Sequence, residues 1–132
     1  MSAIRPNPAE FQKLAAEAKT KTGPVVMLNL LKFKERADGD EVSGRESYMR
    51  YGREVKPMVE ALGGRMLWQG RADQMLIGEE EWDVVALVEY PSREAFIKMA
   101  TSQEMANIHH HREGGLDRTV LIACTAVGQE SI

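Results

Sequence analysis

The sequence has almost no cysteine and no long hydrophobic run, and these two absences exclude whole classes of protein. Its single cysteine, Cys124, has no partner within the chain, which excludes an internal disulfide framework and indicates a reducing compartment. No segment approaches the ~20 apolar residues of a membrane-spanning helix, and the N-terminal residues hold no signal-peptide core. We therefore expect a cytoplasmic protein that makes no membrane contact.

Basic side chains are also too few for a nucleic-acid surface. The chain has 17 Lys and Arg against 20 Asp and Glu, which gives a net charge of -3. The glycine-rich phosphate loop, the dinucleotide fingerprint, the nucleophile elbow and the zinc-binding HExxH motif are all missing. We expect no nucleic-acid partner, no metal and no cofactor.

What remains is an ordinary globular composition. The 132 residues are 43% hydrophobic and 28% charged. A chain of this length buries roughly two-thirds of its unfolded surface, enough for one core. We predict a single domain over 1–132, with an N-terminal helical extension at 1–22 and a core at 24–127.

The apolar run from Pro24 to Phe33 predicts a central strand with two apolar faces. A second run, Val84 to Tyr90, has the same two-sided character. Helices can cover one face of such a sheet, and the other face then needs a cover from outside the chain. In the first run the two faces carry Val25, Met27, Asn29, Leu31 and Phe33 on one side and Val26, Leu28, Leu30 and Lys32 on the other.

Periodicity and capping residues predict the other elements. Pro57 lies inside one expected helix, so we expect a kink or a break at 53–57. Gly70 is expected to mark a bulge in the second strand. The expected helices are 8–19, 44–62, one that follows Ser92 to about 100, and 103–110, and the strands are 24–33, 65–77, 82–90 and 118–127.

Without the first helix the order is strand, helix, strand, strand, helix, strand. This is the α+β, ferredoxin-like βαββαβ order, and right-handed crossovers give an antiparallel four-stranded sheet of order 4-1-3-2. Helices then cover one face only. We therefore predict a homodimer that packs through the uncovered sheet face, with the N-terminal helix as an addition to the ferredoxin-like core.

Four segments carry a family resemblance: the run Pro24–Phe33, the stretch from Tyr51 to Gly63-Gly64-Arg65, Tyr90-Pro-Ser-Arg-Glu-Ala95, and Thr101-Ser-Gln-Glu-Met105 with Arg112. Together they resemble an uncharacterised bacterial family, a domain of unknown function within the dimeric α/β-barrel superfamily, so the resemblance implies a dimeric α/β barrel. The similarity spans about 24–127. It departs at Met105, where members tend to have an aromatic residue. It implies a ferredoxin-like homodimer and leaves the reaction open, because fold does not imply function.

The run His109-His110-His111-Arg112 is the densest group of chemistry-bearing side chains. Successive helical residues point about 100° apart, so three neighbours cannot bind one metal. Three interpretations stay open. The cations can offset the helix dipole, Arg112 can form an anion pocket with one histidine, or the histidines can bind a metal ion. For the histidine of the anion pocket we choose His110.

Asn29 is a lone polar residue on an apolar strand face, so its amide must be hydrogen-bonded or reach a ligand. Tyr48, Tyr51 and Trp68 are candidate walls of the same cleft, although aromatics at such spacing are also ordinary core. Glu89 is either an interface charge paired with an arginine or a pocket acid. The expected ligand-binding set is Asn29, Tyr48, Trp68, His110 and Arg112.

Two functions from different classes fit these residues. The first is a cofactor-independent enzyme of oxygenase or isomerase type that acts on a small organic anion. The second is a non-catalytic dimer that binds a small molecule or has an accessory role in stress. A cleft that brings Asn29 and Arg112 together favours a ligand site, and a collapsed apolar interior opposes it.

Overall fold

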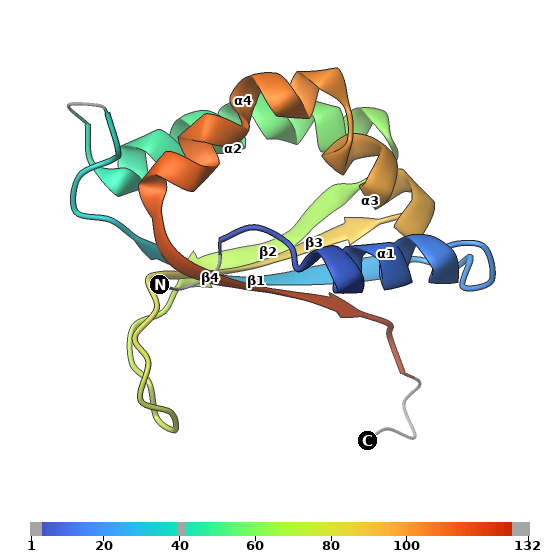
Figure 1. Cartoon of the computed structure of the whole chain (residues 1–132). Coiled ribbons are helices and arrows are strands. Elements are labelled where there is room, and N and C mark those ends of the chain that lie inside the picture. The colour runs from blue at the N-terminus through green and yellow to red at the C-terminus, as the bar shows by residue number, and fades with distance from the viewer. Residues whose placement is uncertain (1–3, 40–41, 128–132) are drawn as a thin grey trace.

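The computed structural model of the chain describes residues 4–39 and 42–127. Its four strands form one antiparallel sheet in the order β2-β3-β1-β4, which is the predicted order 4-1-3-2 seen from the other edge. The helices α2, α3 and α4 lie over one face of this sheet, and α1 packs beside α3 (Figure 1). The elements are α1 (Pro8–Glu17), β1 (Val25–Phe33), α2 (Gly44–Ala61), β2 (Arg65–Arg71), β3 (Val84–Tyr90), α3 (Arg93–Ala100), α4 (Gln103–Gly115) and β4 (Leu116–Cys124).

Alternation along β1 assigns the two faces of the sheet. Val25, Met27 and Leu31 are at most 2% exposed, so this side of β1 faces the helices. The other side, which we call the open face, has no helix over it among the described residues (Figure 1). By the strand register it carries Val26, Leu28, Leu30 and Lys32 of β1, Val85, Leu87 and Glu89 of β3, Val120, Ile122 and Cys124 of β4, and Arg65, Trp68 and Gly70 of β2.

The core fills the space between the sheet and the helices at the end of the sheet where β1 begins. There the Tyr90 ring meets the Phe96 ring edge to face, with centroids 5.1 Å apart. This packing fixes α3 against β3 and so holds the helical layer at one end. The buried cluster consists of Val25, Met27, Val59, Tyr90, Phe96, Met99 and Met105.

Polar side chains cap the helices as the sequence predicts. Asn7 accepts from the backbone amides of Ala9 and Glu10, and Ser43 and Ser92 cap α2 and α3 in the same way. These caps satisfy amides that the first turn of a helix leaves without partners.

A glycine contact joins the two main helices at the other end of the sheet. α2 begins at Gly44 and α4 ends at Gly115, and a Cβ built on Gly115 would lie 2.5 Å from the Gly44 carbonyl oxygen. The backbones therefore approach as closely as only glycine permits. The predicted end of α4 at 110 is wrong, because the helix continues to this contact.

The predicted break at Pro57 is also wrong, because α2 is continuous from Gly44 to Ala61. The kink that was the other expectation does not interrupt the helical hydrogen bonds around it. Pro57 and Arg53 lie on the exposed side of the helix, so water can bond the Arg53 carbonyl that the proline leaves free. Val55 and Val59, on either side of Pro57, pack against the same core.

Several strand ends differ from the prediction, since β3 begins at Val84 and β4 spans Leu116–Cys124, and the largest difference is in β2. β2 pairs only with β3, and the last ladder pair is Arg71 with Val84, so β2 ends at Arg71 instead of 77. The register irregularity lies between Met66 and Trp68, not at Gly70. Residues 72–83 form a long connection that leaves the sheet on the open side (Figure 1).

Replacing Pro57 by alanine should raise the free energy of unfolding by about 2 kcal/mol, because it restores a helical amide and removes the ring. Urea denaturation followed by circular dichroism measures the change. Gly52→Ala is the control on the same helix, since nothing lies within 4 Å of its added Cβ, and propensity alone should gain about 1 kcal/mol. Equal gains would show that the missing bond at Pro57 costs nothing.

Candidate functional site

Two tyrosines of α2 and one arginine of α4 come together on the inner side of the helices. The Tyr48 and Tyr51 rings are 5.3 Å apart, as expected for neighbours three residues apart on one helix. Arg112 is close enough that its charge acts on both hydroxyls. We call Tyr48, Tyr51 and Arg112 the tyrosine–arginine cluster.

Burial sets the protonation state of the two tyrosines. It raises the pKa of Tyr48 well above the usual range, the neighbouring Tyr51 raises it further, and Arg112 opposes them. Burial likewise raises the pKa of Tyr51 against the same arginine. Both hydroxyls therefore stay protonated at neutral pH, and each can donate a hydrogen bond.

The polar groups of the cluster are largely uncommitted. Within the described residues, neither the Tyr48 nor the Tyr51 hydroxyl forms a hydrogen bond, and Arg112 pairs with no carboxylate. Arg112 donates from Nη1 to the Ile4 carbonyl oxygen at 2.7 Å. A part-buried guanidinium and two hydroxyl groups thus keep donors free for an acceptor from outside the chain.

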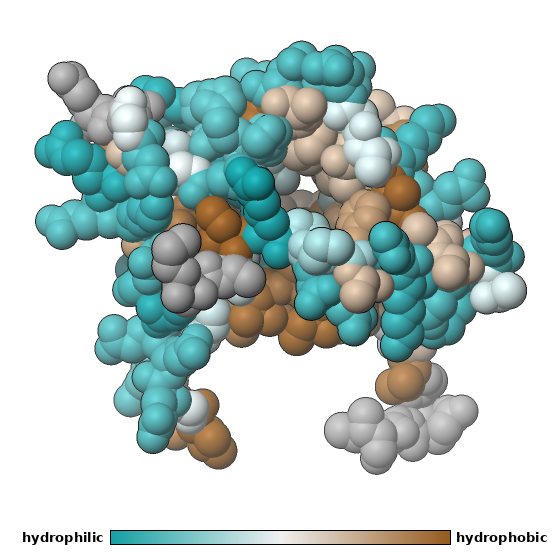
Figure 2. Space-filling model, viewed as in Figure 1, coloured by the Kyte–Doolittle hydropathy of each residue, from teal (hydrophilic) through white to brown (hydrophobic). Residues whose placement is uncertain are grey.

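Asn29 lies below the helices on the same side of the sheet. Its neighbour across the β1–β3 ladder is Ala86, a small buried residue. The Asn29 amide nitrogen donates to the Met27 carbonyl at 3.2 Å, and its oxygen has no partner among the described residues. Figure 2 shows a hollow between the helical layer and the sheet.

Trp68 does not belong to this side, so the prediction that it shares a cleft with Asn29 is corrected. The irregularity after Met66 places Trp68 opposite Leu87, whose side chain faces the open side. The ring lies over Gly70, where a Cβ would come within 2.5 Å of it, and Trp68 is 55% exposed. One extra residue in the strand has turned the side chain to the other face.

His110 does not join the cluster either, which corrects the choice of that histidine. It is exposed, and its ring lies 4.0 Å from the His111 ring. His109 points instead toward Glu113, with Nδ1 3.2 Å from Oε1. Within the described residues no group of three or more His, Cys, Asp or Glu side chains is placed to hold a metal.

The N-terminal segment is tied to α4 beside Arg112, a feature that no sequence pattern indicates. Arg5 Nη2 lies 2.9 Å from Glu113 Oε1, next to the bond between the Ile4 carbonyl and Arg112. Burial raises the pKa of Glu113, but its bonds to Arg5 and His109 lower it by more, so the pKa lies below its usual range.

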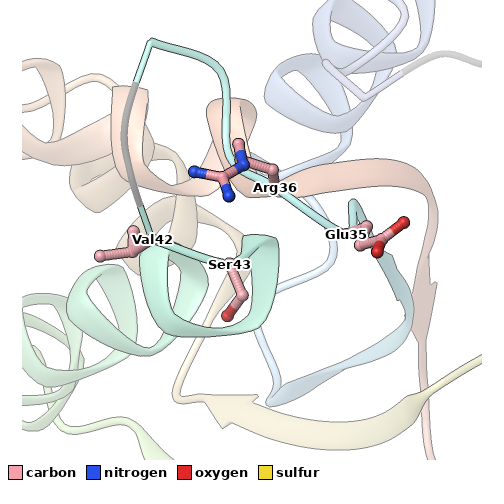
Figure 3. A pocket seen from close by; sticks show the side chains of 4 residues that line it. All are labelled: Glu35, Arg36, Val42 and Ser43. Carbon is pink, nitrogen blue, oxygen red and sulfur yellow. The ribbon is translucent and has the colours of Figure 1, made fainter.

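A surface hollow lies at the start of α2. It is lined by Glu35, Arg36, Val42 and Ser43, and Figure 3 shows these side chains pointing in different directions. They converge on no common point, so the hollow is not a ligand site. Glu89 pairs with Arg65 at 3.0 Å on the open face, which confirms the interpretation of Glu89 as a charge paired with an arginine.

None of the helices within 4–39 and 42–127 combines the length and apolarity that crossing a membrane requires.

The fold defines an α+β protein of the ferredoxin-like class with an added N-terminal helix. Residues 38–125 match the domain of unknown function DUF1330, and the chain belongs to this family. The resemblance to an uncharacterised family is thereby confirmed. A comparison with the curated proteins finds no match.

Solved structures agree with the family and the fold. A protein of unknown function from Rhodopseudomonas palustris is 36% identical, with a TM-score of 0.89 over 97% of this chain and 99% of that one. An Arabidopsis thaliana protein is 15% identical, with a TM-score of 0.60 over 81% and 99%. A dabb family protein from Mesorhizobium loti, described as ferredoxin-like, is 13% identical, with a TM-score of 0.55 over 80% and 99%. The last two show the fold alone.

The pKa of Glu113 predicts a pH dependence. A carboxyl group whose folded pKa is depressed adds stability above its unfolded pKa and loses it as the pH falls through the folded pKa. Glu113→Gln should therefore lower the free energy of unfolding by about 0.5 kcal/mol at pH 7, since the Arg5 side chain is 72% exposed. At about pH 3 the difference should shrink. Denaturation at both pH values is the measurement, with exposed Glu60→Gln as control. A loss of equal size at both pH values contradicts the ion-pair account.

Proposed function

We propose that each subunit binds a small organic anion between the helices and the sheet, with the tyrosine–arginine cluster as its polar end. The observation that carries the proposal is the set of uncommitted donors on Arg112, Tyr48 and Tyr51. A guanidinium forms two parallel hydrogen bonds with a carboxylate, and a charged acceptor bonds it more strongly than the neutral Ile4 carbonyl does. A ligand carboxylate can therefore displace the Ile4 carbonyl from Arg112.

The walls of the site suit an organic ligand. The Phe33 ring lies 5.5 Å from the Tyr48 ring, so aromatic surface adjoins the donors. Asn29 lies on the helix side of β1, and its carbonyl oxygen can accept from a ligand hydroxyl or amide. The anion expected here has one carboxylate and an apolar or aromatic body.

The protonation states favour binding over turnover between the two functions that the sequence left open. Tyr48, Tyr51 and Arg112 are donors at neutral pH, and donors hold an anion without altering it. We therefore place the small-molecule-binding role before the cofactor-independent oxygenase or isomerase role.

A thermal-shift screen of benzoate, phenylacetate and short aliphatic carboxylates tests the site. A ligand at 100 times its dissociation constant should stabilise the wild type by about 2.7 kcal/mol. Arg112→Ala should abolish the shift and remain folded. Arg53→Ala is the matched control, because Arg53 is an exposed arginine on α2 that pairs with Glu46 at 3.4 Å. If no carboxylate stabilises the wild type, or if Arg112→Ala responds equally, the anion site is wrong.

Tyr48→Phe separates binding from folding in the same screen. It should weaken carboxylate binding roughly tenfold and leave the stability of the free protein unchanged or up to about 1 kcal/mol higher, because the hydroxyl has no partner to lose. Tyr90→Phe is the comparison, since the Tyr90 hydroxyl lies 3.6 Å from Met99 Sδ. A Tyr48 hydroxyl needed for folding would show itself as a loss of stability without ligand.

We further propose that two chains pack through their open faces as a homodimer. The open face carries Leu28 and Leu87 at its centre, and Ile122 on it is 47% exposed. Figure 2 shows apolar side chains along this underside of the molecule. Apolar surface of this kind is removed from water most simply by a second copy of the same face.

The structure identifies the leucine that tests the dimer. Leu28 faces the open side, whereas Leu31 is 2% exposed beneath the helices. Leu28→Asp should dissociate a folded protein, because a charge buried in a subunit contact costs several kcal/mol. Leu31→Asp should unfold it. Light scattering coupled to size exclusion, with circular dichroism, distinguishes these outcomes, and a wild type at the 14.8 kDa mass of one chain would contradict the dimer.

A further inference from the structure

The connection between β2 and β3 is a projecting arm, which we define as residues 72–83. It descends from one end of the sheet on the open side, away from every helix (Figure 1). A connection of this length between two paired strands is uncommon without a function, because strand hairpins need only two to five residues. A turn between β2 and β3 does not require an arm of this length.

The arm ends in two large apolar side chains that nothing covers. Leu76 is 84% exposed and Ile77 is 97% exposed, more than the other exposed large hydrophobic residues described. Figure 2 shows an apolar tip on an otherwise hydrophilic projection. Adjacent apolar residues at the end of a projection are typical of a contact with another molecule.

The base of the arm is fixed to the sheet, so the tip is held away from it. The Asp83 carboxylate accepts from the Phe33 backbone amide at 2.9 Å and lies 3.4 Å from Lys32 Nζ. On the other side Arg118 of β4 stacks on the Trp82 ring, 5.1 Å from its centroid, and lies 3.5 Å from Glu80. These contacts span from β1 to β4 and set the direction of the arm.

A groove separates the arm from the open face of its own sheet. Leu30 and Val85 form its sheet side, and its arm side is formed by Ala72, Met75, Ile77, Gly78, Glu79, Glu80 and Trp82. The hollow has a volume of about 470 Å³, which is enough for several side chains of another molecule. The apolar lining is continuous with the open face, so one partner can cover both.

We propose that the arm clasps a second copy of this chain, with Leu76 and Ile77 packed against the partner's open face. The proposal rests on the homodimer proposed above. Any copy placed face to face with the sheet must meet the arm, because both lie on one side of it. Two-fold symmetry then covers both exposed tips and both grooves at once.

Charge on the open side also suits self-association. The arm carries Glu79, Glu80 and Glu81, and the open face beside it carries Lys32 of β1 and Arg65 of β2. One surface that bears both signs can be complementary to itself under a two-fold axis, whereas a surface of one sign repels its copy. This favours a second copy over a strongly charged partner.

The double variant Leu76→Ser, Ile77→Ser tests the clasp. Sedimentation equilibrium should show a dimer dissociation constant raised at least about tenfold, with the fold unchanged, because both side chains are exposed within one chain. Met49→Ser is the matched control. Met49 is an apolar residue of α2 that is 49% exposed and lies in the helical layer, so its loss should leave the dissociation constant unchanged.

Hydrogen exchange of the wild type supplies a second measurement that needs no variant. Amides within 72–83 should exchange more slowly at concentrations where the dimer forms than after dilution. A monomeric wild type would overturn the dimer and the clasp together. A stable wild-type dimer whose dissociation constant is unchanged in the double variant, or whose arm exchanges at the same rate at all concentrations, would overturn the clasp alone.

Discussion

Strand β1 is apolar on both sides, and the rest of the structure follows from this constraint. The chain has enough helix to cover one side, where Val25 and Met27 are buried. That side receives the core and the tyrosine–arginine cluster. The other side keeps Leu28 and Leu30 uncovered by any described helix, so the strand that contributes to the core on one side presents apolar side chains on the other.

The sequence predicts the fold because its signals are redundant. Each strand and helix is marked by periodicity, by a cap and by a turn residue at once, so the order of elements survives errors at their ends. The face of a strand or helix on which a given side chain lies is harder to predict. Trp68 changed face because one irregularity in β2 shifts the alternation, and no residue type marks that irregularity.

The orientation of α4 about its own axis is the second feature that the sequence does not predict. The run of histidines follows no apolar stripe, so the pattern does not say which side chain points inward. The structure turns Arg112 toward the tyrosines and leaves His110 exposed. Tyr48 and Asn29 lie on the inner side, and each lies on a clear stripe, helical for one and alternating for the other.

The two sides of the sheet carry different kinds of side chain. Donors without partners lie on the helix side, whereas exposed apolar groups lie on the open side and along 72–83. The two sets of side chains lie on opposite sides of the sheet. The proposed small-ligand site and the proposed contact between chains can therefore be altered separately.

The contact between Gly44 and Gly115 fixes the separation of α2 and α4 near the tyrosine–arginine cluster. Tyr48 lies one helical turn after Gly44, and Arg112 lies about one turn before Gly115, so the gap between the hydroxyl and the guanidinium is set by the closeness of two backbones. A methyl group at either glycine would push the two helices apart. The distance between the Tyr48 hydroxyl and the Arg112 guanidinium thus depends on two glycines that take no part in the polar site themselves.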